Sequence, residues 1–246
     1  MLVPGGTGGL GLAVAQKVLD SGRAVVLFAR DADAGQRAAQ RLGPKAVFTP
    51  GDVTDEAAVK RAVDAAVGLG RLCATVNCAG GGRAMRTVGR QRPCPLPDFA
   101  GVIETHLTGS FNVVRLAAQR MTTNELVAGE RGVLVNVSSI AAFDGQAGQS
   151  AYAAAKAGIV GMTLPLAREL APWSIRCVTL APGLFETEQT RILPDAVRES
   201  LRSTTVYPHR FGDPGEFAAL VVHVLDNPMI NGAVLRLDGA VRMPPR

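Results

Sequence analysis

Residues 1–11 read MLVPGGTGGLG, and this stretch decides how the rest of the chain is interpreted. A short apolar run stands directly before a glycine-rich segment, Gly5-x-x-x-Gly9-x-Gly11, and a helical pattern follows. Glycines at such a junction let the backbone approach a pyrophosphate, and the helix adds free N–H groups and the positive end of its dipole. An ordinary glycine-rich turn is the alternative, so the rest of the chain must supply the strand and helix context.

That context is an alternation of apolar runs and helical patterns. The apolar runs are Leu2–Val3, Ala24–Ala29, Ala46–Phe48, Leu72–Asn77, Val133–Ser138, Ile175–Leu180 and Ala233–Leu237. The helical patterns are Leu10–Asp20, Asp55–Gly68, Asp98–Thr122, Ala151–Leu170 and Pro214–Asp226. Runs that are apolar throughout are typical of parallel strands buried on both faces. We therefore predict a doubly wound α/β fold, with about seven parallel strands flanked by helices and ligands bound beyond their carboxyl ends.

Local signals support these boundaries. Ser21–Gly22 predicts the end of the first helix, Thr54 an N-cap, and Asp213–Pro214 a cap followed by a first-turn proline. Two long loops, Gly80–Pro97 and Gly183–Gly212, fall at the end of the sheet where a site is expected.

Composition narrows the class of protein. The 246 residues suit one domain over residues 1–246, and 47% hydrophobic with 19% charged residues favours a sizeable core. The net charge of +5 fits anionic small molecules, and the absence of a dense basic run argues against nucleic acid. No apolar run approaches about 20 residues, which argues against a membrane span. Four cysteines without a C-x-x-C pair and no recognisable targeting segment favour a cytoplasmic location.

Three further segments follow strands and would face a dinucleotide. After the second strand come Ala29-Arg30-Asp31, where an arginine accommodates a 2′-phosphate and an acidic residue would instead bind a ribose hydroxyl. We favour NADP, although Asp31 would serve NAD if the strand ended later. Asp52, with Val53, could accept from an adenine amino group, and the small residues of Asn77-Cys78-Ala79-Gly80 would let the chain pass close to the adenosine.

The constellation that carries chemistry is Ser139, Tyr152 and Lys156. Tyr152 and Lys156 are four residues apart and so share one helical face. An ammonium beside a phenol favours the phenolate, and we expect Lys156 to bring the pKa of Tyr152 from about 10 toward working pH. The phenol then becomes a useful acid/base, and Ser139 would donate to a substrate oxygen.

With these residues in their order, the chain resembles the short-chain dehydrogenase/reductase family over essentially its full length. Pro182-Gly183 after the sixth strand completes the set. Within the family it is most similar to the type 2 3-hydroxyacyl-CoA dehydrogenases, and the stretches that carry this are Gly145–Gln149, Gly161–Pro165, Ala181–Phe185 and Asn231–Ala240. The resemblance implies a Rossmann-fold oxidoreductase of fatty acid metabolism that uses NAD or NADP, usually as a homotetramer.

The resemblance also implies roles. Ser139, Tyr152 and Lys156 would be catalytic. Tyr152 and Lys156 would also contact the cofactor, with Lys156 holding the nicotinamide ribose. The nicotinamide end would be lined by Pro182, Gly183, Phe185 and Thr187. The other cofactor contacts would be Gly5, Gly9, Leu10, Gly11, Arg30, Asp52, Val53, Asn77, Cys78, Ala79 and Gly80. No metal site is implied. Oligomer contacts are expected through the helices over Asp98–Thr122 and Ala151–Leu170, and the substrate pocket is expected around Phe143, Gln146, Gln149, Leu184 and Thr187–Tyr207.

Three positions depart from the family pattern. Pro4 stands where threonine is usual and ends a very short first strand, so either the strand lacks residues before Met1 or stability and cofactor affinity are lowered. His106 stands where these enzymes carry an asparagine that supports a water in a proton relay; it would either serve that relay or be a tolerated substitution. Ala29-Arg30 replaces the aspartate of the NAD-preferring type 2 enzymes.

Two alternatives stay open. Arg83, Arg86, Arg90 and Arg92 would either pair with the phosphates of a coenzyme A thioester or form a solvated basic loop. The substrate would be an acyl-CoA or another ketone or steroid, and a binding protein that senses a dinucleotide with little turnover is the non-enzymatic alternative, motivated by Pro4 and His106.

Overall fold

A seven-stranded parallel sheet runs through the middle of the molecule, with strand order β3-β2-β1-β4-β5-β6-β7. The computed structural model describes residues 1–81, 84–89 and 92–245. The strands are β1 (Leu2–Pro4), β2 (Val25–Ala29), β3 (Ala46–Pro50), β4 (Ala74–Asn77), β5 (Gly132–Val137), β6 (Ile175–Pro182) and β7 (Val234–Leu237). The predicted fold class is confirmed, and the sheet order reverses direction between β1 and β4, where α/β folds bind ligands.

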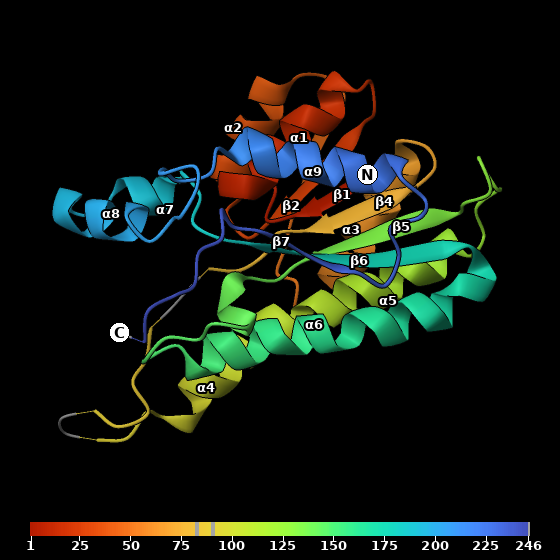
Figure 1. Cartoon of the computed structure of the whole chain (residues 1–246). Coiled ribbons are helices and arrows are strands. Elements are labelled where there is room, and N and C mark those ends of the chain that lie inside the picture. Colours follow the sequence, from red (N-terminus) through yellow and green to blue (C-terminus); the bar gives the residue numbers. More distant parts are fainter. Residues whose placement is uncertain (82–83, 90–91, 246) are drawn as a thin grey trace.

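Helices cover both faces of the sheet (Figure 1). On one face lie α1 (Gly9–Asp20), α2 (Ala32–Leu42) and α9 (Pro214–Asp226); on the other lie α3 (Glu56–Gly68), α5 (Gly109–Met121) and α6 (Ser150–Leu170). Alternate residues of a strand enter opposite layers: Val3 packs with α1 and α9, whereas its neighbour Leu2 packs with α3 and α5. Two buried cores therefore hold one rigid sheet, whose carboxyl edge carries the functional loops.

The first strand keeps its central place despite Pro4. Leu2, Val3 and Pro4 pair with Val26, Leu27 and Phe28 of β2, and Leu2 pairs with Thr75 of β4. Pro4 is the last residue of the strand, and its carbonyl oxygen accepts from the N–H of Cys78 at 2.9 Å. A proline at a strand end leaves the ladder beside it intact, so Pro4 does not interrupt the sheet.

The helix signals are confirmed at two of three positions. The first helix ends at Ser21 with Gly22 at φ +83°, and Asp213 caps α9 in a capping box with Glu216. The prediction for Thr54 is wrong, because Asp55 is the N-cap of α3 and accepts from the N–H groups of Ala57 and Ala58. The Thr54 hydroxyl instead donates to Asp52 in the preceding turn.

Three α-helices lie where no separate helix was predicted. The chain forms α2 directly after β2, and the loop 183–212 contains α7 (Glu188–Arg191) and α8 (Asp195–Arg202). The helix predicted over Asp98–Thr122 is three consecutive pieces: α4 (Leu96–Ile103), a π-helical segment η1 (Glu104–Thr108) and α5. Short 3-10 helices span Ile140–Ala142 and Ala171–Trp173. In the part of the chain that the structure describes, no helix has both the length and the apolar character needed to cross a membrane.

Candidate active site

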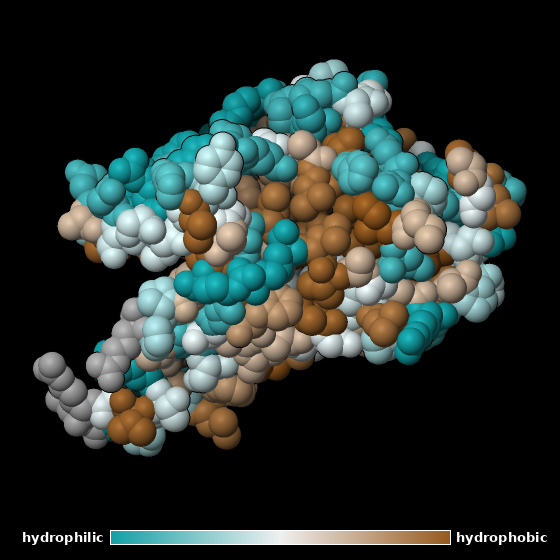
Figure 2. All heavy atoms as spheres, viewed as in Figure 1, coloured by the Kyte–Doolittle hydropathy of each residue, from teal (hydrophilic) through white to brown (hydrophobic). Residues whose placement is uncertain are grey.

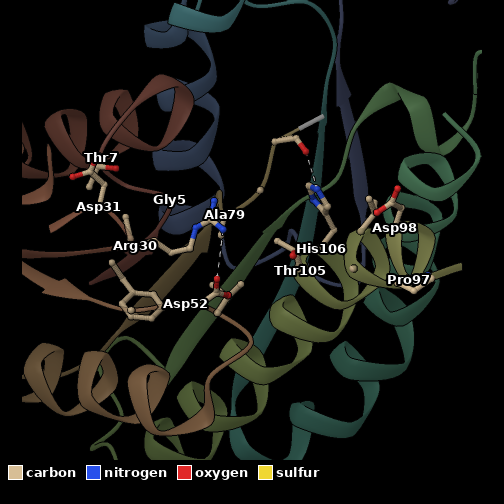
Figure 3. A pocket seen from close by; sticks show the side chains of 18 residues that line it. Gly5, Thr7, Arg30, Asp31, Asp52, Ala79, Pro97, Asp98, Thr105 and His106 are labelled. Atoms are coloured by element: carbon tan, nitrogen blue, oxygen red, sulfur yellow. Dashed lines mark hydrogen bonds and ion pairs between the residues drawn. The ribbon is translucent and has the colours of Figure 1, made fainter. Parts of the chain in front are cut away.

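Two adjoining cavities follow the carboxyl edge of the sheet. One, of about 440 Å³, is lined by the glycine segment, the end of β5, the start of α6 and the chain after β6. The other, of about 790 Å³, is lined by the ends of β2 and β3, the chain after β4, and α4 with η1 (Figure 3). Gly5, Thr7 and Gly80 line both, so the two cavities form one cleft across the point where the strand order reverses.

The glycine segment is shaped so that only glycine fits at key positions. Gly5 has φ +73°, and a Cβ there would lie 2.6 Å from the carbonyl oxygen of Cys78. A Cβ on Gly11 would lie 2.2 Å from the carbonyl oxygen of Gly5. Gly8, the N-cap of α1, has no side chain to bond the first-turn N–H groups. The backbone therefore turns tightly under the cleft and leaves the helix N-terminus open to an anion, as a pyrophosphate requires.

Ser139, Tyr152 and Lys156 line the smaller cavity together with the glycines. Ser139 follows β5 and caps the 3-10 helix, its Oγ accepting from the N–H of Ala141 at 3.1 Å. Tyr152 and Lys156 lie on the first turns of α6, which is held to β5 because Ser138 donates to the carbonyl oxygen of Lys156 at 2.8 Å. The three predicted catalytic residues are therefore assembled by contacts between β5 and α6.

The predicted effect of Lys156 on Tyr152 is not found. Burial raises the pKa of Tyr152, and the neighbouring Ser139 side chain is the group that lowers it. Lys156 is itself buried, which lowers its pKa to about 8. Its Nζ donates to the carbonyl oxygen of Val137 at 2.8 Å and lies 5.7 Å from the centroid of the Tyr152 ring. The ammonium therefore faces the ring and the strand end, away from a direct bond to the phenol oxygen.

His106 lies in η1, buried between the loop after β4 and Tyr152. Its Nε2 is 3.0 Å from the carbonyl oxygen of Gly81, and its ring meets the Tyr152 ring edge-on at 5.2 Å. Gly80, at φ +122°, leaves the space that the imidazole fills, because a Cβ there would lie 2.4 Å from Nδ1. Burial, and next the charge of Lys156, lower the pKa of His106 to about 4, so the ring is neutral at pH 7.

The larger cavity brings together the residues predicted for the adenosine end. Figure 3 shows Arg30 and Asp52 pointing toward one another, and Nη1 of Arg30 lies 3.7 Å from Oδ2 of Asp52. The strand β2 ends at Ala29 as predicted, and the Asp31 carboxylate caps α2 by accepting from the N–H of Ala34 at 2.9 Å. The side chain that reaches into the cleft from this strand end is therefore Arg30, which is 80% exposed.

The chain after β6 closes the other end of the cleft. Pro182, Gly183, Phe185 and Thr187 all line the smaller cavity. The N–H of Gly183 donates to the carbonyl oxygen of Leu237 at 2.9 Å, and a Cβ on Gly183 would lie 2.7 Å from the Asp238 side chain. Thr187 forms a capping box with Thr190 at the start of α7. The segment from Pro182 to Thr187 is therefore held by β7 and the residue after it at one end, and by α7 at the other.

Most predicted cofactor contacts line the cleft. They are Gly5, Gly9, Leu10, Gly11, Arg30, Asp52, Val53, Cys78, Ala79 and Gly80. Asn77 does not, because its buried side chain accepts from the N–H of Ala79 at 3.4 Å. Of the residues expected around the substrate, Leu184 lines the smaller cavity, and so do Thr187, Glu188 and Thr190 of the expected stretch Thr187–Tyr207. Phe143, Gln146 and Gln149 do not line it.

Several residues of the cleft were not predicted. Thr7 lines both cavities, and Asp98 and Thr105 line the larger one. Thr7 stands inside the glycine motif, where its position alone signals the cleft; the others lie on helices whose placement depends on the fold. No group of three or more His, Cys, Asp or Glu side chains within residues 1–81, 84–89 and 92–245 is placed to hold a metal ion.

Comparisons with known proteins agree with this geometry. Residues 1–197 match the family model for short chain dehydrogenases. The chain is 47% identical to 3-hydroxyacyl-CoA dehydrogenase type-2 of Homo sapiens over 99% of this chain and 95% of the human protein. It is also 47% identical to the enzyme of that name from Drosophila melanogaster, covering 99% of this chain and 97% of the fly protein.

A solved structure extends the likeness to three dimensions. The crystal structure of 3-hydroxyacyl-CoA dehydrogenase type-2 from Mycobacterium avium superposes with a TM-score of 0.95 at 41% identity, covering 100% of this chain and 96% of the other. The cleft, the Ser139–Tyr152–Lys156 constellation and these matches together make the chain an oxidoreductase that belongs to the short-chain dehydrogenase family.

Proposed function

We propose that the protein interconverts a 3-hydroxyacyl-CoA and a 3-oxoacyl-CoA with a nicotinamide dinucleotide, preferring NADP. The observation that carries the proposal is that Ser139, Tyr152 and Lys156 share one cavity with the glycine segment. The 3-hydroxyacyl-CoA substrate is inferred from the relatives of that name. Other ketones and steroids remain the alternative substrates for the same chemistry.

The cleft fits the cofactor by its shape. Gly5 and Gly11 leave no room for a Cβ where a pyrophosphate would lie against α1, and the helix presents open N–H groups there. Arg30 would bind a 2′-phosphate, and the segment from Pro182 to Thr187 would hold the nicotinamide. Bound there, the cofactor supplies the hydride for reduction of the carbonyl carbon, or accepts it in the reverse direction.

The protein's own groups manage the proton. The Ser139 Oγ accepts from the backbone N–H of Ala141, and its hydrogen, which interacts with Tyr152, would donate to the substrate carbonyl oxygen. Tyr152 would pass its phenolic proton to that oxygen during reduction and take it back during oxidation. Lys156 uses one donor on Val137, so two more are free for the ribose hydroxyls.

The test is reduction of acetoacetyl-CoA with NADPH and NADH by wild type and Tyr152→Phe. We expect Tyr152→Phe to lower kcat by about 10²- to 10⁴-fold while the Kd for NADPH stays within about twofold. Trp173→Phe is the control for a change at an aromatic side chain, since Trp173 is 50% exposed and lines neither cavity of the cleft. Turnover that is insensitive to Tyr152→Phe would remove this mechanism, and tight cofactor binding without turnover of any ketone would favour a sensor.

Recognition of coenzyme A would fall to the arginine loop. Arg86 and Arg92 are exposed and line a surface cavity of about 410 Å³ with Cys94 and Asp98. Arg83 and Arg90 lie outside the described residues. Replacing Arg86 and Arg92 by alanine should raise KM for acetoacetyl-CoA and spare a short ketone without coenzyme A. Equal effects on both substrates would mean that the loop is a solvated basic surface.

The remaining expectations concern the oligomeric state of the protein and its location in the cell. We infer a homotetramer, because α4, α5 and α6 expose Phe99, Phe111 and Leu164 by 36%, 47% and 45%. Light scattering should give four times the chain mass, and Phe111→Glu should lower it. We also infer a cytoplasmic location and a role in fatty acid metabolism. The location is supported by four free thiols, because the cytosol keeps thiols reduced; they belong to Cys73, Cys78, Cys94 and Cys177.

A further inference from the structure

Arg236, in the last strand, joins three separate segments beside the active site. Its Nε donates to Oδ2 of Asp238 and its Nη2 to Oδ2 of Asp144, both at 2.7 Å. Nη2 also donates to the carbonyl oxygen of Val241 at 3.1 Å, and the guanidinium carbon lies 5.1 Å from the centroid of the Phe143 ring. One side chain thus contacts β7, the chain after it, and the loop that leads from Ser139 to α6.

Each arm of this cluster ends at a part of the site. Asp238 packs against Gly183, which lines the cleft at its nicotinamide end. Asp144 and Phe143 lie in the loop between Ser139 and Tyr152. The guanidinium of Arg236 is planar and rigid, and it forms hydrogen bonds to the carboxylates of both Asp144 and Asp238. It therefore sets the distance between the Phe143–Asp144 pair and the Gly183 segment.

The cluster of Arg236, Asp144, Asp238 and Phe143, which we call the joint, is partly shielded from solvent. The side chains of Arg236, Asp144 and Asp238 are 23%, 19% and 10% exposed, so their bonds are better shielded from water than a surface ion pair. The chain end reinforces it: the N–H of Ala147 donates to the carbonyl oxygen of Pro245 at 3.1 Å, and Nε2 of Gln146 to that of Pro244 at 3.2 Å. Figure 1 shows this end running beside the start of α6.

The joint also holds an apolar side chain in the loop between Ser139 and Tyr152, outside the smaller cavity. Phe143 is 47% exposed although the guanidinium stacks on its ring. Figure 2 shows the molecule hollowed between the α7–α8 region and the loop that precedes α4, on the side where the chain end lies. A half-exposed aromatic ring held in one place on this loop is suited to contact the acyl part of a substrate that extends out of the cavity, whereas the proton step occurs inside it, at Tyr152.

We propose that Arg236 is a positioning residue that sets the place of Phe143–Asp144 relative to the nicotinamide segment, and so sets affinity for the acyl part of the substrate. The proposal rests on the proposed function for its substrate, but the position of the loop does not depend on which ketone is turned over. Loosening the joint should raise KM and leave the proton step at Tyr152 unchanged.

The kinetic test uses Asp144→Ala, which cuts the loop arm and leaves Arg236–Asp238 in place. We expect KM for acetoacetyl-CoA to rise about tenfold, with kcat, its pH profile and the Kd for NADPH changed less than about twofold. Asp144→Asn keeps an acceptor oxygen and should recover most of the loss. Arg242→Gln is the matched control, because Arg242 also contacts Asp238, at 3.4 Å, but is 64% exposed and forms no ion pair with Asp144. An unchanged KM, or a fall in kcat with a shifted pH profile, would overturn the proposal.

A second measurement needs no turnover. In Asp144→Ala, amide hydrogen exchange over residues 143–149 should be at least about tenfold faster than in wild type, while β5 and α6 keep their protection. Unchanged exchange in this loop would overturn the proposal even if acetoacetyl-CoA is not a substrate. If wild type does not reduce acetoacetyl-CoA but the loop does exchange faster in Asp144→Ala, the proposed substrate fails and the positioning role stands.

Discussion

His106 donates from Nε2 to the carbonyl oxygen of Gly81 across 3.0 Å, which fixes the tautomer of the ring. A carbonyl oxygen can only accept, so Nε2 carries the hydrogen and Nδ1 carries a lone pair. Nδ1 is buried and has no hydrogen-bond partner among the described residues, and Gly80 covers it. In this arrangement His106 ties the loop after β4 to η1 with its one donor, and its second nitrogen is closed off from the cleft.

The buried imidazole of His106 makes the free energy of unfolding depend on pH. In the unfolded chain the ring takes up a proton near pH 6.5, whereas in the folded protein its pKa is lowered to about 4. The unfolded state therefore binds more protons between these values, and the free energy of unfolding should fall as pH drops from 6.5 to 4. The loss should approach about 3 kcal/mol in urea unfolding. Glutamine does not titrate between pH 6.5 and 4, so the free energy of unfolding of His106→Gln should fall by about 3 kcal/mol less than that of wild type over this range. Parallel pH profiles of unfolding for the two proteins would contradict the lowered pKa of His106.

Arg30 should decide the choice between the two cofactors. It extends from the end of β2, and Asp31 is engaged in capping α2. We expect Arg30→Ala to raise the Kd for NADPH about tenfold, because an arginine contributes charge-assisted bonds to a phosphate, and to leave NADH within about twofold. Fluorescence titration measures both. Arg37→Ala, an exposed arginine of α2, serves as the control, and tighter binding of NADH than NADPH by wild type would show that the cofactor assignment is wrong.

Gly11 and Gly8 provide a matched pair in the glycine segment. A Cβ on Gly11 would lie 2.2 Å from the carbonyl oxygen of Gly5, whereas one on Gly8 would meet nothing within 4 Å. Gly11→Ala should therefore lower the free energy of unfolding by about 1–3 kcal/mol, the usual cost of overpacking, and Gly8→Ala should not. Equal stability of the two variants would mean that the turn can relax around the added methyl group.

The ion pair between Arg176 and Glu130 should matter more than its surface counterparts. Nε of Arg176 lies 2.5 Å from Oε1 of Glu130, and its other donors reach the carbonyl oxygens of Val224, Leu225 and Ile230. Glu130→Ala leaves a guanidinium buried without its counter-ion and should cost about 3 kcal/mol in chemical unfolding. Asp226→Ala removes the exposed pair with Arg23 and should cost less than about 1 kcal/mol. A similar cost for both would show that the Arg176 charge is satisfied by carbonyls alone.

The strands were predictable because each is a local apolar run. All seven appear within about two residues of their expected bounds, since strands buried on both faces need no polar alternation that could be misjudged. Helix α2 was missed for the opposite reason. Its buried positions are the small residues Gly35, Ala38 and Ala39, so the segment has no stripe of large apolar side chains to mark a buried helix.

The parts of the site that depend on local spacing in the sequence could be predicted, whereas contacts between residues far apart in the sequence could not. Tyr152 and Lys156 are four residues apart on one helix, and Ser139 follows a strand, so spacing and strand order predict that all three lie at one edge of the sheet. The direction of the Lys156 ammonium depends on the Val137 carbonyl, 19 residues away. The bond from Arg236 to Asp144 spans 92 residues, and no local pattern connects those two positions.

The π-helical segment η1 gives the helix it interrupts one extra residue without turning the two flanking helices relative to each other. A π-turn holds more residues than an α-turn, so the five residues Glu104–Thr108 rotate the chain about as far as four α-helical residues would. The α4 residues on the cleft and the buried residues Asn112 and Val113 of α5 therefore keep their faces, while the wider turn holds His106 beside the carbonyl oxygen of Gly81. Deleting one residue from this segment should restore a regular helix and keep both flanking faces, and the contact that it should remove is the one between His106 and Gly81.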